Sequence, residues 1–351
     1  MRSSSLRSFT QRPAGRETAT AGRRRFLASL SGRRPAAEGG DYWIRVHRTA
    51  MACRFEITLA AQDGAAVPAA SAALDGIDRL ERELSLFRET SAIAELNRSA
   101  ASGPVRVAPY LVDLLDECRR VHRETGGAFD VTSTPLSRCW GFLRRQGRVP
   151  DPEAIETARA LVGFDAVQLD REQNTVRFTR PGIELNLGAI GKGFALDRAA
   201  AEMRTAGAAH ALLSAGGSSF VALGGRGDGW RIDLVSPRVS GRPIATLQLR
   251  NAALGTSGAG EQFVVADGRR YGHVIDPRTG WPAIGVLSAS VVASDAATAD
   301  ALSTAFLVGG ADLARRYCAE HLDVLALVTP EGGSTAPLVF GSHRAAQVVK
   351  D

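Results

Sequence analysis

The stretch QFVVADGRRYGHVIDPRTGWP, residues 262–282, contains two β-rich runs separated by Asp267-Gly268. This dipeptide is typical of a two-residue turn between antiparallel strands. The sequences FDAVQLD and TVRFT, which flank REQN at residues 171–174, predict a second hairpin. Residues 43–60 are also rich in strand-forming side chains. Antiparallel hairpins are therefore expected to build the sheet.

Helices are predicted between these strands. Apolar residues recur at helical spacing over residues 68–84 and 110–124. Further helices are expected over 151–161, 191–206, 295–308 and 312–321, and further strands at ALLSA, FVALG, WRIDLV, VLSASVVA and, as the last one, VLALVT. Helices and hairpins follow one another without a regular βαβ rhythm, which predicts an α+β fold.

The positive charge of the chain is concentrated at its N-terminus. Residues 1–40 carry nine arginines and two acids, a balance of +7, whereas the whole chain carries +6. Residues 41–351 are therefore nearly neutral, and no nucleic-acid partner is expected. The four cysteines are scattered without a CxxC pair, which favours reduced thiols over a disulfide framework or a metal cluster.

The composition divides the chain into three parts. Residues 1–40 are expected to be disordered, residues 41–345 to form the folded domain, and residues 346–351 to form a C-terminal tail. The run Arg23-Arg24-Arg25-Phe26-Leu27 resembles a twin-arginine export signal, but the apolar stretch after it is short. A cytoplasmic location is therefore favoured over export to the periplasm. No apolar run approaches the length of a membrane span, so no transmembrane segment is expected.

The segment ELNLGAIGKGFALDRAA, residues 184–200, places three glycines and Lys192 where a helix begins. Accessible backbone amides at a helix N-terminus, together with a lysine, suit a phosphate group. The spacing is not that of a Walker A loop, which needs four residues between its glycines and a Ser or Thr after the lysine. The alternative is that the glycines permit close packing of a strand and a helix.

The segment SDAATADALSTAF, residues 294–306, places Asp300 and Thr304 on one face of a predicted helix, with Ser303 beside them. A carboxylate and hydroxyls are hard oxygen ligands that suit Mg²⁺. The alternatives are structural: Asp295 caps the helix, and Thr304 bonds to a carbonyl of its own helix.

Two further segments carry polar groups that suit a ligand. In GGAFDVT, residues 126–132, a glycine ends a helix, and the backbone is able to line a planar ligand while Asp130 accepts hydrogen bonds from it. Tyr271, His273 and Ile275 share one face of a strand, and Asp276 begins the turn that follows. A histidine near an aspartate is suited to proton transfer, and the alternative is a strand-edge histidine bonded to the backbone.

These segments occur together and in order, and the chain resembles the ApbE family, the FAD:protein FMN transferases. The resemblance covers about residues 42–345. It runs through MACRFEI (51–57), LSLFRETSAIAELN (84–97), GGAFDVTSTPLSRCWGF (126–142), LNLGAIGKGFALD (185–197), LLSAGGSSFVALG (212–224), LGTSGAGEQF (254–263), YGHVIDPRTGWP (271–282) and DAATADALSTAF (295–306).

The resemblance implies a fold of two pseudo-repeated halves, built from antiparallel sheets and packed helices, with FAD in a cleft between them. It implies a Mg²⁺-dependent transferase that moves FMN from FAD to a Ser or Thr hydroxyl of a partner flavoprotein and releases AMP. Two alternatives remain. One is a Mg²⁺-dependent FAD pyrophosphatase with water as the acceptor, and the other is a non-catalytic FAD-binding protein.

The resemblance also implies roles for individual residues. His273 would be the general base, and Asp276 an orienting or alternative acid/base group. The metal would be held by the backbone carbonyl of Ala189 and the side chains of Asp300 and Thr304, with Ser303 in the outer shell. The positions expected to contact FAD are Met51, Phe87, Ala128, Phe129, Asp130, Asn186, Lys192 and Ile275, and Trp281-Pro282 would wall the site. Asn186 stands where the family frequently has Asp, and Met51-Ala52-Cys53 where it frequently has Met-Gly-Thr.

Overall fold

The computed structural model describes residues 42–349 except 226–227, 236–242, 261 and 333–335. Its centre is an eight-stranded antiparallel sheet with the order β1-β2-β6-β7-β10-β13-β14-β15. These strands are β1 Trp43–Ala50, β2 Cys53–Ala60, β6 Ala211–Ala215, β7 Ser219–Leu223, β10 Ala252–Gly258, β13 Val286–Ala293, β14 Leu325–Pro330 and β15 Leu338–Gly341. The α+β class predicted from the hairpins is confirmed.

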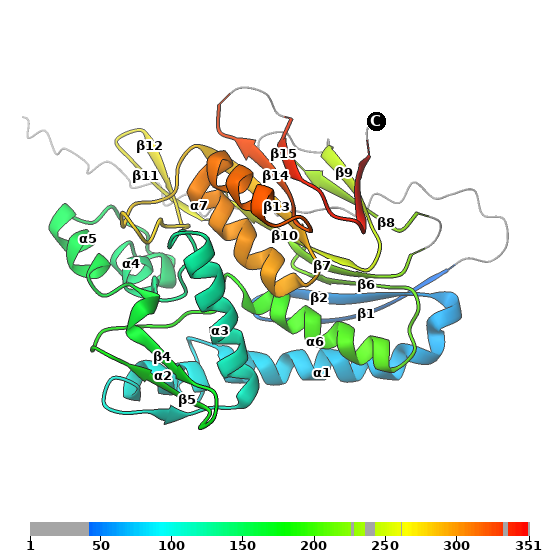
Figure 1. Cartoon of the computed structure of the whole chain (residues 1–351), viewed down its shortest axis with the longest axis horizontal. Coiled ribbons are helices and arrows are strands. Elements are labelled where there is room, and N and C mark those ends of the chain that lie inside the picture. Colours follow the sequence, from blue (N-terminus) through cyan, green and yellow to red (C-terminus); the bar gives the residue numbers. More distant parts are fainter. Residues whose placement is uncertain (1–41, 226–227, 236–242, 261, 333–335, 350–351) are drawn as a thin grey trace, which may run out of the picture.

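Three helices cover one face of this sheet: α1 Val67–Leu84, α6 Gly191–Thr205 and α7 Ala296–Glu320 (Figure 1). The apolar positions of α1, among them Leu74 and Ile77, are buried in the main hydrophobic core together with Phe55 and Ile57 of β2. Burial of an apolar side chain of this size contributes about 1.5–3 kcal/mol, so this layer supplies much of the stability.

A smaller sheet covers the other face. It has the order β16-β9-β8, with β8 at Trp230–Val235, β9 at Pro243–Leu249 and β16 at Ala346–Val349. A second apolar cluster, which includes Phe220, Ile232 and Leu247, lies between the two sheets. The tail predicted at residues 346–351 is therefore wrong over Ala346–Val349, because that segment pairs with β9. Residues 1–40, predicted to be disordered and to include a run that resembles an export signal, lie outside the described residues.

The remaining elements extend from the α6 and α7 side. They are α2 Ala92–Ser99, α3 Pro109–Glu124, α4 Thr134–Cys139, α5 Pro152–Arg159, a sheet of β3 Val105–Arg106, β5 Thr175–Phe178 and β4 Val167–Asp170, and the hairpin of β11 Phe263–Ala266 and β12 Arg269–Gly272. Figure 1 shows α4, α5 and the β11–β12 hairpin close together at one end of the molecule. Among the described residues, none of the helices combines the length and the apolar character that crossing a bilayer requires.

Most of the local predictions are confirmed, including both hairpins and the helices at 68–84, 110–124 and 191–206. Two differ. The helices expected at 295–308 and 312–321 form one element, α7, which is interrupted at Gly310 (φ 74°, ψ −172°). The strand VLALVT is not the last one, since β15 and β16 follow it. The repeat of two halves stays a prediction.

Candidate functional site

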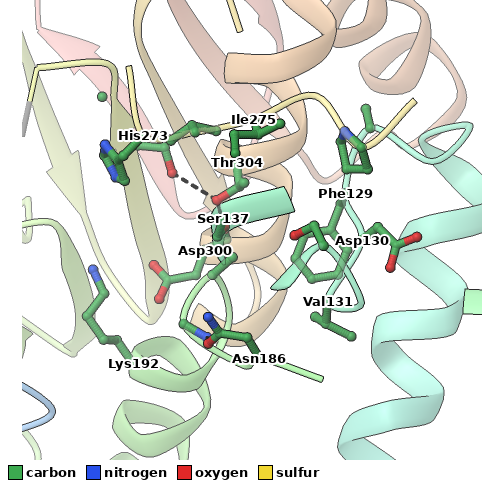
Figure 2. Close-up of a pocket in the computed structure, with 18 of the residues that line it drawn as sticks. Phe129, Asp130, Val131, Ser137, Asn186, Lys192, His273, Ile275, Asp300 and Thr304 are labelled. Carbon is green, nitrogen blue, oxygen red and sulfur yellow. Dashed lines mark hydrogen bonds between the residues drawn. The ribbon is translucent and has the colours of Figure 1, made fainter. Parts of the chain in front are cut away.

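A pocket of about 330 Å³ opens where the ends of several elements meet. Its wall is formed by the 128–137 segment, residues 186–192 before and within α6, Ser218, the end of β10, residues 273–275, Pro277 and the first turns of α7. Figure 2 shows His273 and Lys192 on one side of this space, Phe129 and Val131 on the other, and Asp300 between them. The volume is at the lower end of the range for small-molecule sites.

Two glycines allow α7 to approach the rest of the site. A Cβ on Gly193 would lie 2.0 Å from the carbonyl oxygen of Ala296, and a Cβ on Gly255 would lie 2.5 Å from the carbonyl carbon of Ala299. Any other residue at these positions would overlap the backbone of α7. This close contact places the Asp300 side chain against the first turn of α6 and against β7.

Asp300 is held by two donors. The backbone N–H of Gly193 donates to its Oδ2 (2.8 Å), and the hydroxyl of Ser219 donates to its Oδ1 (2.7 Å). Burial raises the pKa of the Asp300 carboxyl above its ordinary value, and the charge of Lys192 and the two hydrogen bonds oppose this shift. A buried carboxylate beside a pocket gains most from a bound cation.

The glycine amides at the start of α6 are already bonded within the protein. Gly188 N–H donates to the Asn186 side chain (2.9 Å), Gly191 N–H to the carbonyl of Leu187 (2.7 Å), and Gly193 N–H to Asp300. The three glycine amides are therefore engaged within the protein, and the close packing of Gly193 against α7 agrees with the packing alternative. The phosphate site stays a prediction. Lys192 remains as the cation of this segment, and its Nζ donates to the hydroxyl of Ser218 (2.6 Å).

The three predicted metal donors, Ala189, Asp300 and Thr304, all line the pocket. The hydroxyl of Thr304 donates to the carbonyl of Asp300 (3.3 Å) and lies 3.1 Å from the hydroxyl of Ser257, which also contacts Ser303 (2.8 Å). In the part of the chain that the structure describes, no three His, Cys, Asp or Glu side chains are grouped for a metal. A carboxylate, a carbonyl and a hydroxyl nevertheless fit Mg²⁺, which accepts few protein ligands and takes its remaining oxygens from water or phosphate.

His273 follows β12 directly and lines the pocket. Its backbone N–H donates to the carbonyl of Gln262 (3.0 Å), and its ring Nδ1 lies 3.2 Å from the same oxygen. A carbonyl oxygen only accepts, so this contact assigns the proton of the neutral ring to Nδ1. Nε2 is then the nitrogen with the basic lone pair.

Asp276 is used by the turn that it begins. Its carboxylate accepts from the backbone N–H (2.9 Å) and the Nε and Nη2 atoms (2.8 and 2.7 Å) of Arg278, and its carbonyl accepts from Gly280 N–H (2.8 Å). Asp276 does not line the pocket, whereas the adjacent Pro277 does. Trp281, expected to wall the site, instead packs against Trp140, with ring centroids 5.5 Å apart.

Asp130 is also engaged within the protein. Its Oδ1 accepts from the backbone N–H (2.7 Å) and the hydroxyl (2.6 Å) of Thr132, and its Oδ2 lies 3.3 Å from Nδ1 of His122 in α3. Burial opposes charge on His122, but the hydrogen bond to Asp130 and its negative charge outweigh burial and raise the pKa of His122. The Asp130 side chain therefore anchors the pocket-lining segment to α3, and in Figure 2 it points away from Asp300 and Lys192.

Ten of the predicted site residues line the pocket: Ala128, Phe129, Asp130, Asn186, Ala189, Lys192, His273, Ile275, Asp300 and Thr304. Met51 and Phe87 do not. Met51 lies in the β1–β2 turn against the main core, and the Phe87 side chain is 75% exposed. The sequence reasoning missed Ser218, Ser257 and His122. The first two lie inside segments that resemble the family, whereas nothing in its helical context distinguishes His122.

The comparison with known proteins points to a single family. The model of the ApbE family matches residues 51–328. A FAD:protein FMN transferase from Klebsiella pneumoniae is 31% identical over 269 residues, which are 74% of this chain and 76% of that protein. A FAD:protein FMN transferase from Treponema pallidum is 36% identical over 251 residues, which are 67% of this chain and 69% of that protein.

Solved structures agree with the sequence comparison. The ApbE protein from Thermotoga maritima has a TM-score of 0.77 at 31% identity, covering 86% of this chain and 97% of that one. The flavin transferase ApbE from Vibrio cholerae has a TM-score of 0.74 at 26% identity, covering 86% of this chain and 98% of that one.

Proposed function

The chain belongs to the ApbE family, and from this premise we propose that it is a Mg²⁺-dependent FAD:protein FMN transferase that modifies a Ser or Thr hydroxyl. Its curated relatives carry the name FAD:protein FMN transferase, and this chain is accordingly a flavin transferase. The Mg²⁺ dependence, the type of acceptor hydroxyl and the role of each residue are our proposals, drawn from the family resemblance and from the pocket.

One observation carries the proposal: a basic histidine nitrogen, a lysine ammonium and a buried carboxylate line the same pocket. In the proposed reaction, the acceptor oxygen attacks the phosphorus on the flavin side of the FAD diphosphate. The bond to the AMP phosphate breaks, AMP leaves, and the proton of the hydroxyl is transferred to the protein. In this step the histidine would accept the proton of the hydroxyl, the carboxylate would bind the metal, and the lysine would balance negative charge on the diphosphate.

His273 is the proposed acceptor of the proton. Its Nδ1–H donates to the Gln262 carbonyl, which orients the ring, and Nε2 is the nitrogen that would take the proton of the acceptor hydroxyl. Asp276 is committed to Arg278, so we assign it the role of holding the turn after His273 rather than an acid/base role.

Lys192, Asp300 and Thr304 form the proposed diphosphate side of the pocket. Mg²⁺ would be held by the Ala189 carbonyl, the Asp300 carboxylate and the Thr304 hydroxyl, and when bound it would neutralise charge on the diphosphate. Gly193 N–H and Ser219 orient the Asp300 carboxylate. The ammonium of Lys192, oriented by Ser218, adds a fixed positive charge.

The flavin is expected to bind against the other wall of the pocket. This wall offers the backbone of Ala128, the ring of Phe129 and the aliphatic side chain of Ile275. The anchor formed by Asp130, Thr132 and His122 keeps this wall in place. Because the anchor is internal, its carboxylate is not expected to bind the flavin directly.

The proposal is tested with a candidate flavoprotein acceptor incubated with this chain, FAD and Mg²⁺. Mass spectrometry should show a gain of one FMN on a Ser or Thr, together with formation of AMP, and EDTA should abolish both. An Asp300→Ala variant should lose the Mg²⁺-dependent reaction, because one carboxylate supplies most of the protein's charge at this site. Formation of AMP and free FMN with no modified acceptor would instead support the hydrolase alternative, and wild-type activity of Asp300→Ala would remove the metal assignment.

A further inference from the structure

The β11–β12 hairpin is flanked in the chain by residues of the pocket wall. Gly258 at the end of β10 and His273 after β12 both line the pocket, and the hairpin lies between them in the chain. Within the described residues it forms a sheet of its own, so each of its two strands has an edge that is paired with no other strand. An acceptor hydroxyl that reaches His273 from solvent therefore passes close to this hairpin.

The inner face of the hairpin is packed against residues 141–149. A Cβ on Gly147 would lie 2.2 Å from the side chain of Val264, and the ring of Tyr271 lies 5.5 Å from that of Trp140. The Gln262 side chain donates to the carbonyl of Phe142 (3.1 Å). The hairpin and the 141–149 segment thus form one continuous surface at the pocket.

This surface carries five exposed arginines: Arg144, Arg145, Arg148, Arg269 and Arg270. We call them the arginine surface. None of them has a described carboxylate within ion-pair distance, whereas Arg138 and Arg278 nearby are paired with Glu184 and Asp276. Asp267 is the only carboxylate among the described residues of 141–149 and 262–272, and Glu261 lies outside the described residues. Residues 41–351 as a whole carry −1, so the excess of positive charge on this surface contrasts with a nearly neutral folded part.

Apolar side chains accompany the arginines on the outer face of the hairpin. Phe263 and Val265 are 37% and 64% exposed, and the guanidinium of Arg270 lies 3.6 Å from the centre of the Phe263 ring. Arginine and aromatic residues together are characteristic of protein interfaces. A solvated charged surface has no need of the exposed apolar pair.

We propose that the arginine surface binds an extended acidic segment of the acceptor protein, next to the hydroxyl that receives FMN. The inference rests on the transfer to a protein hydroxyl proposed above. The free edges of the hairpin suit an extended partner, since such an edge pairs with the backbone of a bound segment. The unpaired arginines supply the charge complementarity and steer the segment toward His273.

The test uses three peptides of equal length, each with a single threonine flanked by Asp and Glu, by Gln, or by Lys. The wild-type chain with FAD and Mg²⁺ should attach FMN to the acidic peptide with the highest kcat/KM, as followed by mass spectrometry. The double variant Arg144→Glu, Arg270→Glu should lower kcat/KM for the acidic peptide about tenfold, because two attractions become repulsions. The same variant should use the Lys peptide better than the wild type does.

A matched control reverses two exposed arginines of another sheet, Arg106→Glu in β3 and Arg177→Glu in β5; β5 lies below the β11–β12 hairpin, at the opposite edge of the view in Figure 1. It should leave all three rates unchanged, and calorimetry should give the wild-type affinity for FAD in both double variants. Equal rates for the acidic and Gln peptides, or equal losses in the two double variants, would overturn the inference. So would FMN on none of the peptides with FAD binding intact, or tighter binding of a single-stranded oligonucleotide than of the acidic peptide. Failure of the wild type to bind FAD would count against the proposed function instead.

Discussion

His273 acts through one nitrogen of its ring, and its environment determines which one. The Gln262 carbonyl accepts from Nδ1–H, so proton transfer depends on Nε2. This contact joins the histidine to the residue that precedes β11. The histidine therefore takes its orientation from the same hairpin that carries the arginine surface.

Replacement of His273 by alanine should lower FMN transfer by about 10²–10⁴-fold, the usual contribution of a positioned base. FAD affinity should stay nearly unchanged, because the base acts on the acceptor hydroxyl and not on the bound nucleotide. Rates come from the mass-spectrometric assay and affinity from calorimetry. His47→Ala, an exposed histidine on β1, is the control. Transfer at the wild-type rate by His273→Ala would refute the assignment.

The environment of Asp197 in α6 predicts how the stability of the fold depends on pH. It accepts from the backbone N–H groups of Ala296 and Ala297 (2.8 and 2.9 Å) at the start of α7, and burial raises its pKa from 3.8 to about 7. The folded state therefore holds this proton more tightly than the unfolded state does. The stability that this group contributes is complete below about pH 4 and is lost as the pH rises to about 7.

Denaturant unfolding of the wild type and of Asp197→Asn should reveal this contribution. The free energy of unfolding of the wild type should decrease, relative to that of the variant, as the pH is raised from about 4 to about 7. The difference between the two curves removes the contribution of all other titrating groups. Parallel curves over this range would show that Asp197 keeps an ordinary pKa.

At the level of elements, the site depends on the contact between the first turns of α6 and α7. Gly193 lies against Ala296, and its N–H bonds to Asp300. Gly193→Ala should therefore destabilise the fold by about 1–3 kcal/mol or more, since the added methyl overlaps a backbone that is packed on both sides. The variant should also lose the Mg²⁺-dependent reaction, because α7 carries Asp300 and Thr304.

Gly191→Ala is the matched control for that variant. It lies in the same turn of α6, but its added Cβ would be 3.9 Å from the nearest side-chain atom. Thermal unfolding and the transfer assay should place this variant close to the wild type. Helix propensity favours alanine over glycine by about 1 kcal/mol, so a similar loss in both variants would show that any side chain at the start of α6 is harmful and would count against a specific role of the α6–α7 contact.

The elements that the sequence predicted well are those specified by neighbouring residues. The Asp267-Gly268 turn and the apolar spacing of α1 and α3 are local signals, and the structure has each of them. The α6–α7 contact and the use of the glycine amides depend on residues more than 100 positions apart, such as Gly193 and Asp300. No periodicity or turn rule reports such contacts, so the sequence did not indicate that these amides are bonded within the protein.

The same distinction applies to the site. Ten predicted residues line the pocket because the segments that resemble the family contain them. The environments of Asp130 and Asp276 were not predictable, since His122 lies on α3 and the side chain of Arg278 was free to point elsewhere. Residue identity was therefore accessible from the sequence, whereas the partner of each charged group was not.

At the scale of the whole molecule, the two faces of the large sheet differ in function: one carries the pocket, and the other is covered by the small sheet. The helical face carries the pocket, whereas β8, β9 and β16 contribute none of its lining residues. Deletion of residues 346–351 should therefore lower stability by about 1–3 kcal/mol, as expected for exposing the partly buried Val348 and its neighbours, without changing FAD affinity. Thermal unfolding and calorimetry test both statements.

A shorter truncation, which removes only residues 350 and 351, is the control and should unfold like the wild type. It keeps β16 and its pairing with β9. A loss of FAD affinity in the longer truncation would show that the two faces are coupled, and an unchanged melting temperature would show that β16 adds nothing to the small sheet.

The pairing of β16 with β9 also has a consequence for the protein while it is being synthesised. β9 ends at Leu249, and its partner Ala346–Val349 is translated almost one hundred residues later. Until then the nascent chain presents an open strand edge of β9 to every other chain around it. The strand that closes this edge is thus translated after every residue that lines the pocket. Premature termination near residue 345 should consequently produce a polypeptide that already contains the whole reaction centre but is prone to aggregate.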